Sequence, residues 1–404
     1  MAININAKTS GVGGLETTAD NSGNINIQSG GSTVMSVTSS GVAVTGSFSQ
    51  NGAVYSTQPS FRNLIINGDM RIDQRNAGTS YTSSNANVYT LDRWITFETG
   101  GISSRFTIQQ NAGSVTPPTG FTNYMGITSS VASAVTTGMI QSIAQKIEGF
   151  NASDLAWGTA NAKTVTISFW VRSSLTGTFG GVLSNGAVNY SYPFNYTISV
   201  ANTWEQKTIT VAGPTAGTWV TNNGAGPVLQ FVIGTGSTYQ GSAGSWSANG
   251  YYGVTGTVDV TGTNGATLYI TGVQLETGTT ATDFENLQYG TQLALCQRYY
   301  YKRILGLFGV GWCVNTTTTS ISITFPTSMR TAPTALETTG TANNYQVVYL
   351  ASAAACSAVP AFGGETSTES TRVDASVASG LTAGQGAGLR SGTSGVYLAW
   401  SAEL

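Results

Sequence analysis

The chain consists largely of short runs in which apolar and polar side chains alternate, separated by Gly, Asn, Ser or Pro. In the clearest run, residues 163–173, four apolar side chains fall on one face and one tryptophan on the other: Val165, Ile167, Phe169 and Val171 against Trp170. A period of two is typical of a β-strand with one buried face. Residues 203–213, 228–234 and 267–276 show similar patterns. From residue 61 to about 288 such runs recur without amphipathic helices between them, which predicts an antiparallel two-sheet sandwich of the jelly-roll type.

Two segments depart from this pattern. Residues 141–155 favour a short helix, although their periodicity is ambiguous. Residues 289–296 are predicted to form a second short helix, followed by an aromatic strand at 299–301. Beyond it, strand patterns with Pro and Gly stops predict a second β domain, with an exposed loop near residues 362–370.

The composition agrees with an all-β protein. A chain of 404 residues is long enough for two or three domains, each with its own core. It contains 51 Gly, 18 Tyr and 14 Phe beside many Thr, Ser, Val and Asn, which favour strands and turns. Only 8% of the residues are charged, against roughly 25% in a typical soluble domain. Much of the polar surface must be uncharged, which fits a protein that works inside an assembly.

Charge and hydropathy exclude two kinds of partner. The formal net charge is -2 and there is no long basic run, so we expect no binding to nucleic acid. The first ten residues lack the basic and apolar segments of a secretory signal. The longest apolar run, residues 304–314, is too short to span a bilayer and contains glycines. We therefore expect a chain made in a cytoplasm without membrane insertion.

The cysteines and the absence of histidine narrow the chemistry further. Cys296, Cys313 and Cys356 are odd in number and widely spaced, so buried apolar thiols are expected rather than a disulfide framework. Without histidine, neither Ser-His-Asp nor Cys-His nucleophile systems are possible, and zinc sites that use imidazole are excluded.

Residues 1–58 hold few large side chains and read as short strands joined by turns. Apolar residues alternate in three consecutive segments: Ile25 and Ile27; Val34, Met35 and Val37; Val42, Val44 and Phe48. Three such strands cannot bury enough apolar area by themselves to offset the loss of chain entropy. The pattern favours an ordered arm that trimerises with two further copies; the alternative is a disordered leader rich in Gly and Ser.

Five blocks of sequence are more specific than the strand patterns. They are NLIINGDMRIDQR at 63–75, YTLDRW at 89–94, LYITGVQLE at 268–276, GTTATDFENLQYGTQLALCQRYYYKR at 278–303, and GLTAGQGAGLRSGTSGVYLAWSAEL at 380–404. In this order they resemble tail-fibre proteins of bacteriophages that contain a jelly-roll domain similar to carbohydrate-binding modules.

The resemblance implies three regions and a role in the virion. Residues 1–58 would form a trimerising β arm that docks to other phage virion proteins, 59–290 the jelly roll, and 291–404 a distal C-terminal β domain. The implied function is that of a homotrimeric tail fibre that attaches to host cell-surface polysaccharide by non-catalytic, multivalent binding. Two alternatives are a capsid decoration or head fibre protein with the same fold, and a glycan-hydrolysing tailspike.

Candidate glycan-binding residues are aromatic. Sugar-binding modules of this shape place flat aromatic faces against pyranose rings and read hydroxyls with amides. One glycine-rich loop gathers Trp246, Tyr251 and Tyr252 beside Asn249. A second cluster alternates on one strand face and is either a stacking platform or a trimer contact: Tyr190, Tyr192, Phe194 and Tyr196. Other tryptophans stand in strand patterns and are expected to pack in sheets or cores: Trp94, Trp170, Trp204 and Trp400.

The resemblance also raises the question of a structural calcium ion. Asp69, Asp73 and Glu276 are candidate ligands, because calcium prefers oxygen donors. The expected carboxylate pair in the last strand is replaced by Thr271 and Gly272, so a turn held by side-chain hydrogen bonds from Asn67 and Asp69 is favoured over a metal site.

Two further interpretations concern charged residues. The basic and aromatic cluster at residues 298–303 is expected to pack and form salt bridges between domains rather than to bind nucleic acid. Eighteen Asp and Glu residues permit some carboxylate pairing, but no motif singles out a pair for glycan hydrolysis. We therefore expect no catalytic residues and no enzymatic activity.

Overall fold

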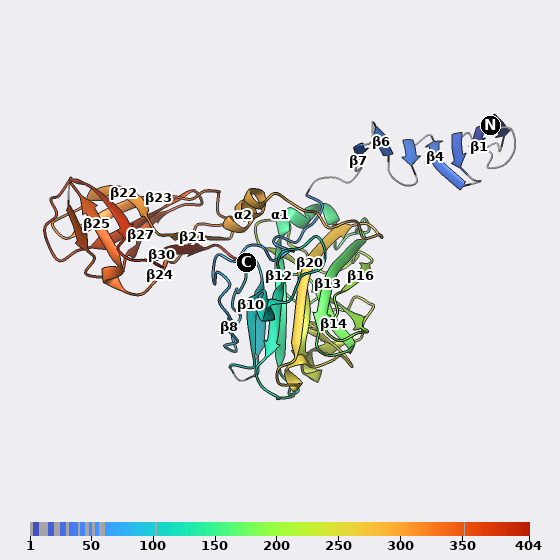
Figure 1. The fold of residues 1–404 in the computed structure, drawn as a ribbon, viewed down its shortest axis with the longest axis horizontal. Helices are drawn as coiled ribbons and strands as arrows, with labels where there is room; N and C mark the ends of the chain where they lie inside the picture. Colours follow the sequence, from blue (N-terminus) through green and yellow to red (C-terminus); the bar gives the residue numbers. More distant parts are fainter. Residues whose placement is uncertain are drawn as a thin grey trace. The chain divides into compact units, whose positions relative to one another are not determined.

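The computed structural model describes residues 3–7, 15–19, 25–29, 32–38, 41–44, 48–50, 53–55, 61–101, 103–350 and 352–404. The chain forms two compact units, Met1–Ser60 and Phe61–Leu404. Antiparallel sheets make up most of the described structure, so the prediction of an all-β fold is confirmed (Figure 1). None of the described helices is long and apolar enough to cross a membrane.

The first unit contains a five-stranded sheet in the order β2-β1-β3-β4-β5 and a separate hairpin. Its strands are β1 (Ile3–Ala7), β2 (Leu15–Ala19), β3 (Ile25–Ser29), β4 (Ser32–Thr38), β5 (Gly41–Val44), β6 (Phe48–Gln50) and β7 (Ala53–Tyr55). The strands predicted at β3, β4 and β5 are present. Side chains are described at 25–28, 32–38 and 42, and none of these is buried; Ile25 is 41% exposed and Val42 is 60% exposed. The side chains of Val44 and Phe48 lie outside the described part.

The second unit begins with a β-sandwich made of a six-stranded and a five-stranded sheet. The six-stranded sheet has the order β16-β13-β20-β11-β10-β8, with β8 (Tyr81–Thr82), β10 (Phe106–Gln110), β11 (Met125–Ser129), β13 (Val165–Ser173), β16 (Glu205–Val211) and β20 (Thr267–Thr277). The five-stranded sheet has the order β15-β14-β17-β12-β9, with β9 (Ile95–Thr99), β12 (Ile140–Glu148), β14 (Gly177–Ser184), β15 (Ser191–Ile198) and β17 (Ala225–Thr235). Short elements connect these strands: β18 (Gln240–Gly241), β19 (Gly253–Val254), α1 (Gly149–Ala152), and 3-10 turns at Ala112–Ser114, Ser153–Leu155, Ser237–Tyr239 and Val260–Gly262.

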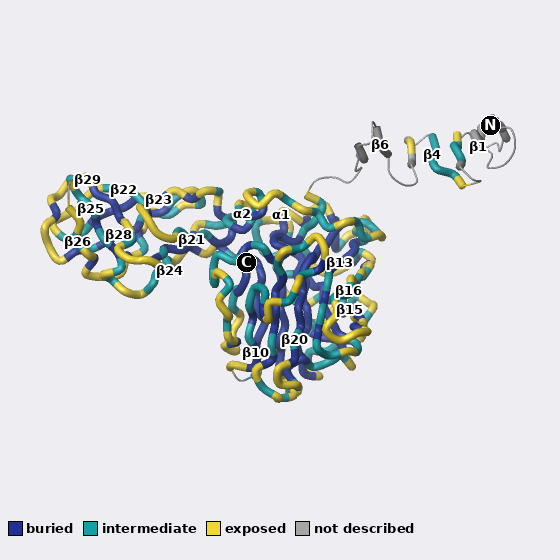
Figure 2. Tube along the Cα trace, in the orientation of Figure 1, coloured by how far each residue is buried: buried dark blue, intermediate teal, exposed yellow. Residues whose placement is uncertain are grey.

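The core of the sandwich lies between these two sheets. Phe169 of β13 contacts Phe231 of β17, with ring centroids 4.9 Å apart and the rings edge to face. The predicted inward set of β13 is fully buried, whereas Trp170 points away from this core. Figure 2 shows the buried residues running along β20 and β13. The alternation in β13 therefore identified one face of the core correctly.

The NGD motif at residues 67–69 builds the entry into the sandwich. Asn67 has a left-handed backbone (φ 59°). Its side-chain amide holds the turn closed, because it accepts a hydrogen bond from Ile72 N (2.9 Å) and donates one to Ile72 O (2.8 Å). A Cβ at Gly68 would lie 2.1 Å from the carbonyl oxygen of Val273 in β20, so only glycine fits. The predicted turn held by Asn67 is confirmed; Asp69 pairs instead with Arg71.

The helix predicted at residues 141–155 is wrong over its first half. Residues 140–148 form β12, which hydrogen-bonds to β17 on one side and β9 on the other, and only α1 and a 3-10 turn follow. Both faces of β12 are covered: Ile143 packs in the sandwich core and Ile140 packs on the outer face. A strand buried on both faces loses its clean alternation, which explains the ambiguous pattern.

The chain then passes through α2 (Tyr289–Gln297) into a second pair of sheets. A seven-stranded sheet has the order β26-β25-β29-β22-β23-β28-β27, with β22 (Leu307–Cys313), β23 (Thr318–Thr324), β25 (Tyr345–Tyr349), β26 (Ser352–Ala355), β27 (Ala361–Thr366), β28 (Ser370–Ser376) and β29 (Gly386–Ser391). A three-stranded sheet has the order β21-β30-β24, with β21 (Tyr300–Ile304), β24 (Glu337–Thr338) and β30 (Tyr397–Ser401); a 3-10 turn spans Ala342–Asn344. A separate hydrophobic cluster around Trp400 fills this half.

Predictions for this half are confirmed in part. The helix at 289–296 and the strand after it are present as α2 and β21. The loop expected at 362–370 is wrong: β27 and β28 pair there, and only residues 367–369 form the turn between them. The domain boundary at residue 290 stays a prediction.

All three cysteines are free and buried. Burial raises the pKa of the Cys356 thiol to about 11. Cys296 is fully buried, and desolvation raises its pKa well above the usual value. The prediction of buried apolar thiols is confirmed.

A network of buried charges connects the last residues of the chain to the sandwich. Arg93, which is 1% exposed, pairs with Glu403, and Arg75 reaches the same carboxylate at 3.2 Å. Burial alone would lower the pKa of Arg93, but the Glu403 carboxylate together with Tyr299, Tyr89 and Cys296 outweighs burial and raises it. The Arg93 guanidinium also lies 3.5 Å from the centre of the Tyr299 ring.

The cluster at residues 298–303 forms the second part of this network. Arg298 pairs with Glu148 at the end of β12 (2.6 Å), and the Tyr299 hydroxyl donates to the same carboxylate (2.6 Å). Burial would raise the pKa of Glu148, but its hydrogen bonds from Arg298 and Tyr299 hold it below the usual value. Lys302 donates to the Arg75 carbonyl (2.9 Å). The prediction of packing and salt bridges at this junction is confirmed.

We expect Glu403→Ala to lower the free energy of unfolding by about 3 kcal/mol, because it leaves Arg93 buried without a counter-charge. The matched control is Asp154→Ala, which breaks the solvent-exposed pair with Lys163 (3.3 Å) and should cost less than about 1 kcal/mol. Urea unfolding at pH 7 measures both. Equal losses in the two variants would contradict the central role of Glu403.

Candidate functional site

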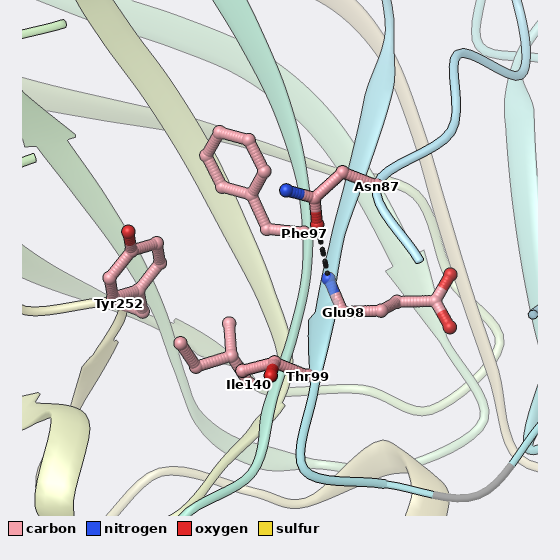
Figure 3. Close-up of a pocket in the computed structure, with 6 residues that line it drawn as sticks. All are labelled: Asn87, Phe97, Glu98, Thr99, Ile140 and Tyr252. Atoms are coloured by element: carbon pink, nitrogen blue, oxygen red, sulfur yellow. Dashed lines mark hydrogen bonds between the residues drawn. The ribbon is translucent and has the colours of Figure 1, made fainter. Parts of the chain in front are cut away.

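A pocket of about 310 Å³ lies on the outer face of the five-stranded sheet, at its β9 edge. Six residues line it: Asn87, Phe97, Glu98, Thr99, Ile140 and Tyr252 (Figure 3). Successive residues alternate between the two faces here, which puts Trp94, just before β9, into the sandwich core and Phe97 of β9 into an outer cluster. The sheet therefore has a second, smaller apolar layer on its outer face, and the pocket opens beside it.

Aromatic and aliphatic side chains form the apolar part of this pocket. Ile140 of β12 lies opposite Thr99 of β9 and belongs to the same hydrophobic cluster as Phe97. Tyr252 packs edge to face on Phe97 with ring centroids 5.9 Å apart. Tyr252 also meets Tyr239 edge to face at 5.8 Å. A backbone hydrogen bond from Tyr252 N to Tyr239 O (2.9 Å) fixes the loop over the sheet. Burial, and then the neighbouring Tyr239, raise the pKa of Tyr252, so its hydroxyl is protonated at neutral pH.

Polar groups surround the apolar part. The side-chain carbonyl oxygen of Asn87 accepts a hydrogen bond from the backbone N–H of Glu98 (3.0 Å). The side-chain nitrogen of Asn87 has no hydrogen-bond partner in the part of the chain that the structure describes. Figure 3 shows this nitrogen on the side of Phe97, whereas the Glu98 carboxylate turns away from Phe97 and Tyr252. Glu98 accepts from Asn85 N (3.0 Å), and burial raises its pKa. An apolar floor with a free amide donor and a hydroxyl group suits a ring that carries both C–H faces and hydroxyls.

Of the first predicted cluster, only Tyr252 reaches this pocket. Trp246 lies half-buried among other aromatic rings: Trp157, Trp219, Tyr190 and Tyr192. Its indole nitrogen donates to Ala212 O (2.7 Å). Tyr251 packs against Gly241, and its hydroxyl accepts from the exposed Asn249 (3.3 Å). The loop folds back onto the sandwich and packs Trp246 against its aromatic side chains, so the binding of a glycan by Trp246 stays a prediction.

The second predicted cluster points inward. Phe194 and Tyr196 belong to the sandwich core, and Tyr192 packs partly against it. Tyr196 contacts Phe169 edge to face at 5.0 Å. Tyr190 stacks on Trp246 with ring planes 15° apart. The prediction of a stacking platform or trimer contact is wrong for Phe194 and Tyr196, because β15 turns this face toward the opposite sheet. By contrast, Trp94, Trp170, Trp204 and Trp400 pack in cores or sheets as predicted.

The three candidate calcium ligands are engaged separately. Asp69 pairs with Arg71, and burial raises the pKa of its carboxyl. Asp73 accepts from the backbone of Asn76 (3.0 Å) and Gly78 (2.7 Å). Glu276 accepts from Thr282 and Gln274. Among the described residues, no three ligating side chains gather into a metal site.

The sequence did not single out Asn87, Phe97, Glu98, Thr99 or Ile140. A signal was present at residues 94–97, where Trp94 just before β9 and Ile95 and Phe97 within it put bulky side chains on both faces. A strand that is apolar on both faces indicates that something covers the outer face as well. The sequence alone does not predict that residues 239–252 cover the outer face of β9.

This chain resembles known proteins in its structure. The sequence matches no protein-family model and no curated protein. A putative sugar binding protein from Bacteroides thetaiotaomicron is similar at 13% identity and a TM-score of 0.32, over 54% of this chain and 100% of that one. A family 11 carbohydrate-binding module of a Clostridium thermocellum cellulase has 13% identity and a TM-score of 0.25, over 51% and 98%.

A third similar structure is the enzymatically active domain of tailspike protein 4 from bacteriophage CBA120. It has 13% identity and a TM-score of 0.29, and the match covers 54% of this chain but 22% of that one. Similarities of this size assign neither a ligand nor an activity to this chain.

We expect Trp246→Ala to lower the free energy of unfolding by about 3 kcal/mol, because it opens a cavity among four aromatic rings. Ser245→Ala, an exposed neighbour in the same loop, should change it by less than about 0.5 kcal/mol. Chemical denaturation followed by far-UV circular dichroism measures both. Wild-type stability in Trp246→Ala would show that this ring is free to serve a ligand instead.

Proposed function

We propose that this protein binds glycans without cleaving them, through the pocket between β9, β12 and Tyr252. The observation that carries the proposal is the combination of an aromatic and aliphatic floor with the free amide of Asn87 at its rim. Pyranose rings present apolar C–H faces and polar hydroxyl edges, and this lining matches both. Glu98 is the one carboxylate that lines the pocket, whereas hydrolysis of a glycosidic bond commonly uses two.

The wider role that we propose is that of a phage virion protein, a homotrimeric tail fibre that attaches to host polysaccharide. The support is the sequence resemblance at residues 63–75, 89–94 and 268–303, together with the first unit. Every described side chain of that unit is at least partly exposed, so these side chains contribute little buried apolar area in a single copy. In a trimer, three weak pockets would act together, and effective concentration would strengthen attachment.

Tyr252→Ala should weaken glycan binding about tenfold, because losing the ring removes roughly 1.4 kcal/mol of contact. The control is Tyr251→Ala, which changes the same loop without touching the pocket and should bind normally. A glycan array identifies the ligand, and titration calorimetry compares the two variants. Unchanged affinity in a folded Tyr252→Ala protein would place the site elsewhere, and hydrolysis of the bound glycan would contradict a non-catalytic role.

Light scattering on the whole chain should give three times the 41.8 kDa subunit mass. A chain that lacks residues 1–58 should remain folded, because the second unit has its own cores, but it should not enter virions. Incorporation is measured by complementing a phage that lacks the gene. A monomeric full-length chain, or normal incorporation of the truncated one, would contradict the role of this arm.

A further inference from the structure

The outer face of the seven-stranded sheet carries an exposed tryptophan. The inner face of this sheet packs on the cluster around Trp400 through residues such as Ile321 and Val373. The outer face presents Val310 and Trp312 of β22, which are 61% and 52% exposed. Two large apolar side chains exposed on one sheet face can mark a binding surface. This face therefore differs from an ordinary solvated surface.

Strand register places polar side chains beside that ring. Trp312 lies opposite Ser320 of β23, which lies opposite Asp374 of β28. In the next row, Val310 lies opposite Ser322, which lies opposite Arg372. A pocket of about 320 Å³ lies beside these rows. Val310 does not line it, whereas Trp312 and several hydroxyl and charged side chains do: Ser320, Ser322, Ser370, Thr371, Glu365 and Arg372.

Two polar features of this pocket point to a ligand. Ser320 is 2% exposed, and its hydroxyl has no hydrogen-bond partner among the residues that the structure describes. A buried hydroxyl without a partner is unfavourable, and a hydroxyl group entering the pocket could supply one. Arg372 is held in place by Asp374 at 3.1 Å and by Glu365. The guanidinium N–H donors of Arg372 and the carboxylates of Asp374 and Glu365 form a fixed array of hydrogen-bonding groups at the edge of the pocket.

We propose that this pocket is a second glycan-binding site and that it takes a neutral pyranose. The indole of Trp312 offers a face for the C–H side of the ring, and Ser320, Arg372 and Glu365 can bind its hydroxyls. One guanidinium and two carboxylates give the site a charge of about -1, so an anionic sugar is repelled. The site shares no residue with the pocket at Tyr252, and it extends the proposed function to the C-terminal half of the chain.

A second copy of this chain is a less suitable occupant. The centres of protein interfaces are depleted of charged residues, whereas three charged side chains, Glu365, Arg372 and Asp374, stand in or beside this pocket. A buried ion pair gains little over an apolar contact of the same area. A small ligand that leaves these charged groups partly in contact with water avoids the desolvation cost that a protein interface would impose.

The test uses the full chain with Tyr252→Ala, so that sugar binding reports on the second site. The probes are methyl glycosides of glucose, galactose, mannose and N-acetylglucosamine, followed by saturation-transfer NMR. We expect binding of at least one of them, with a loss of at least fivefold in affinity on adding Trp312→Ala. Val310→Ala, on the same strand and face but outside the pocket, should leave the affinity unchanged. The methyl glucuronide should bind about fivefold more weakly than the methyl glucoside at low ionic strength.

Three results would overturn this inference. Failure of the Tyr252→Ala chain to bind any of these sugars, with binding by the wild type, would leave the first site intact and remove the second. Affinity that is unchanged by Trp312→Ala would show that the ring does not contact the sugar. A loss of oligomer mass in Trp312→Ala by light scattering, with sugar binding unchanged, would identify this face as a contact between copies of the chain.

Discussion

The buried pair between Arg93 and Glu403 is the interaction on which the second unit depends. A guanidinium that is 1% exposed is tolerable only with a counter-charge, and the carboxylate comes from a residue 310 positions later in the chain. Tyr299 covers the guanidinium, and Arg330 holds the carbonyls of Ala402 (2.7 Å) and Glu403 (2.6 Å). The end of the chain is thereby fixed on the sandwich, beside β12 (Figure 1).

This anchoring extends to the pocket on the outer face. Lys146 of β12 and Tyr89 both donate to the Leu404 carbonyl (2.7 Å each), and the Lys146 ammonium lies 5.9 Å from the centre of the Phe97 ring. Tyr89 packs on the same apolar layer as Phe97 and Tyr252. The floor of the proposed glycan site is therefore supported by the ionic network as well as by the sheet. Support of this kind holds a binding surface in one geometry, which reduces the entropy lost when a ligand binds.

The two proposed sugar sites use the same chemistry on different architecture. At Tyr252 a loop folds over an edge strand and makes a pocket beside a second apolar layer. At Trp312 the sheet itself is the platform, and strand pairing alone sets the spacing of the tryptophan, serine and ion pair. A strand side chain repeats its face every second residue, so a flat sheet can present such a row without any loop. Weak sites on two parts of one chain would add to the multivalency of the trimeric fibre that we propose.

The sequence by itself determined the all-β class, strands such as β13 and β20, the helix α2, the burial of Cys296, and the ionic packing of residues 298–303. Each of these follows from local pattern or composition, which a single sequence displays. Only the tertiary structure decided that residues 140–148 are a strand, that Tyr196 faces the core and that Trp246 packs among other rings. Alternation shows that one face of a strand is buried, but not what covers it, and a loop's composition does not reveal which surface it folds onto. Phe97 and Trp312 became candidate site residues only when distant strands and loops placed an amide, a tyrosine or an ion pair beside them.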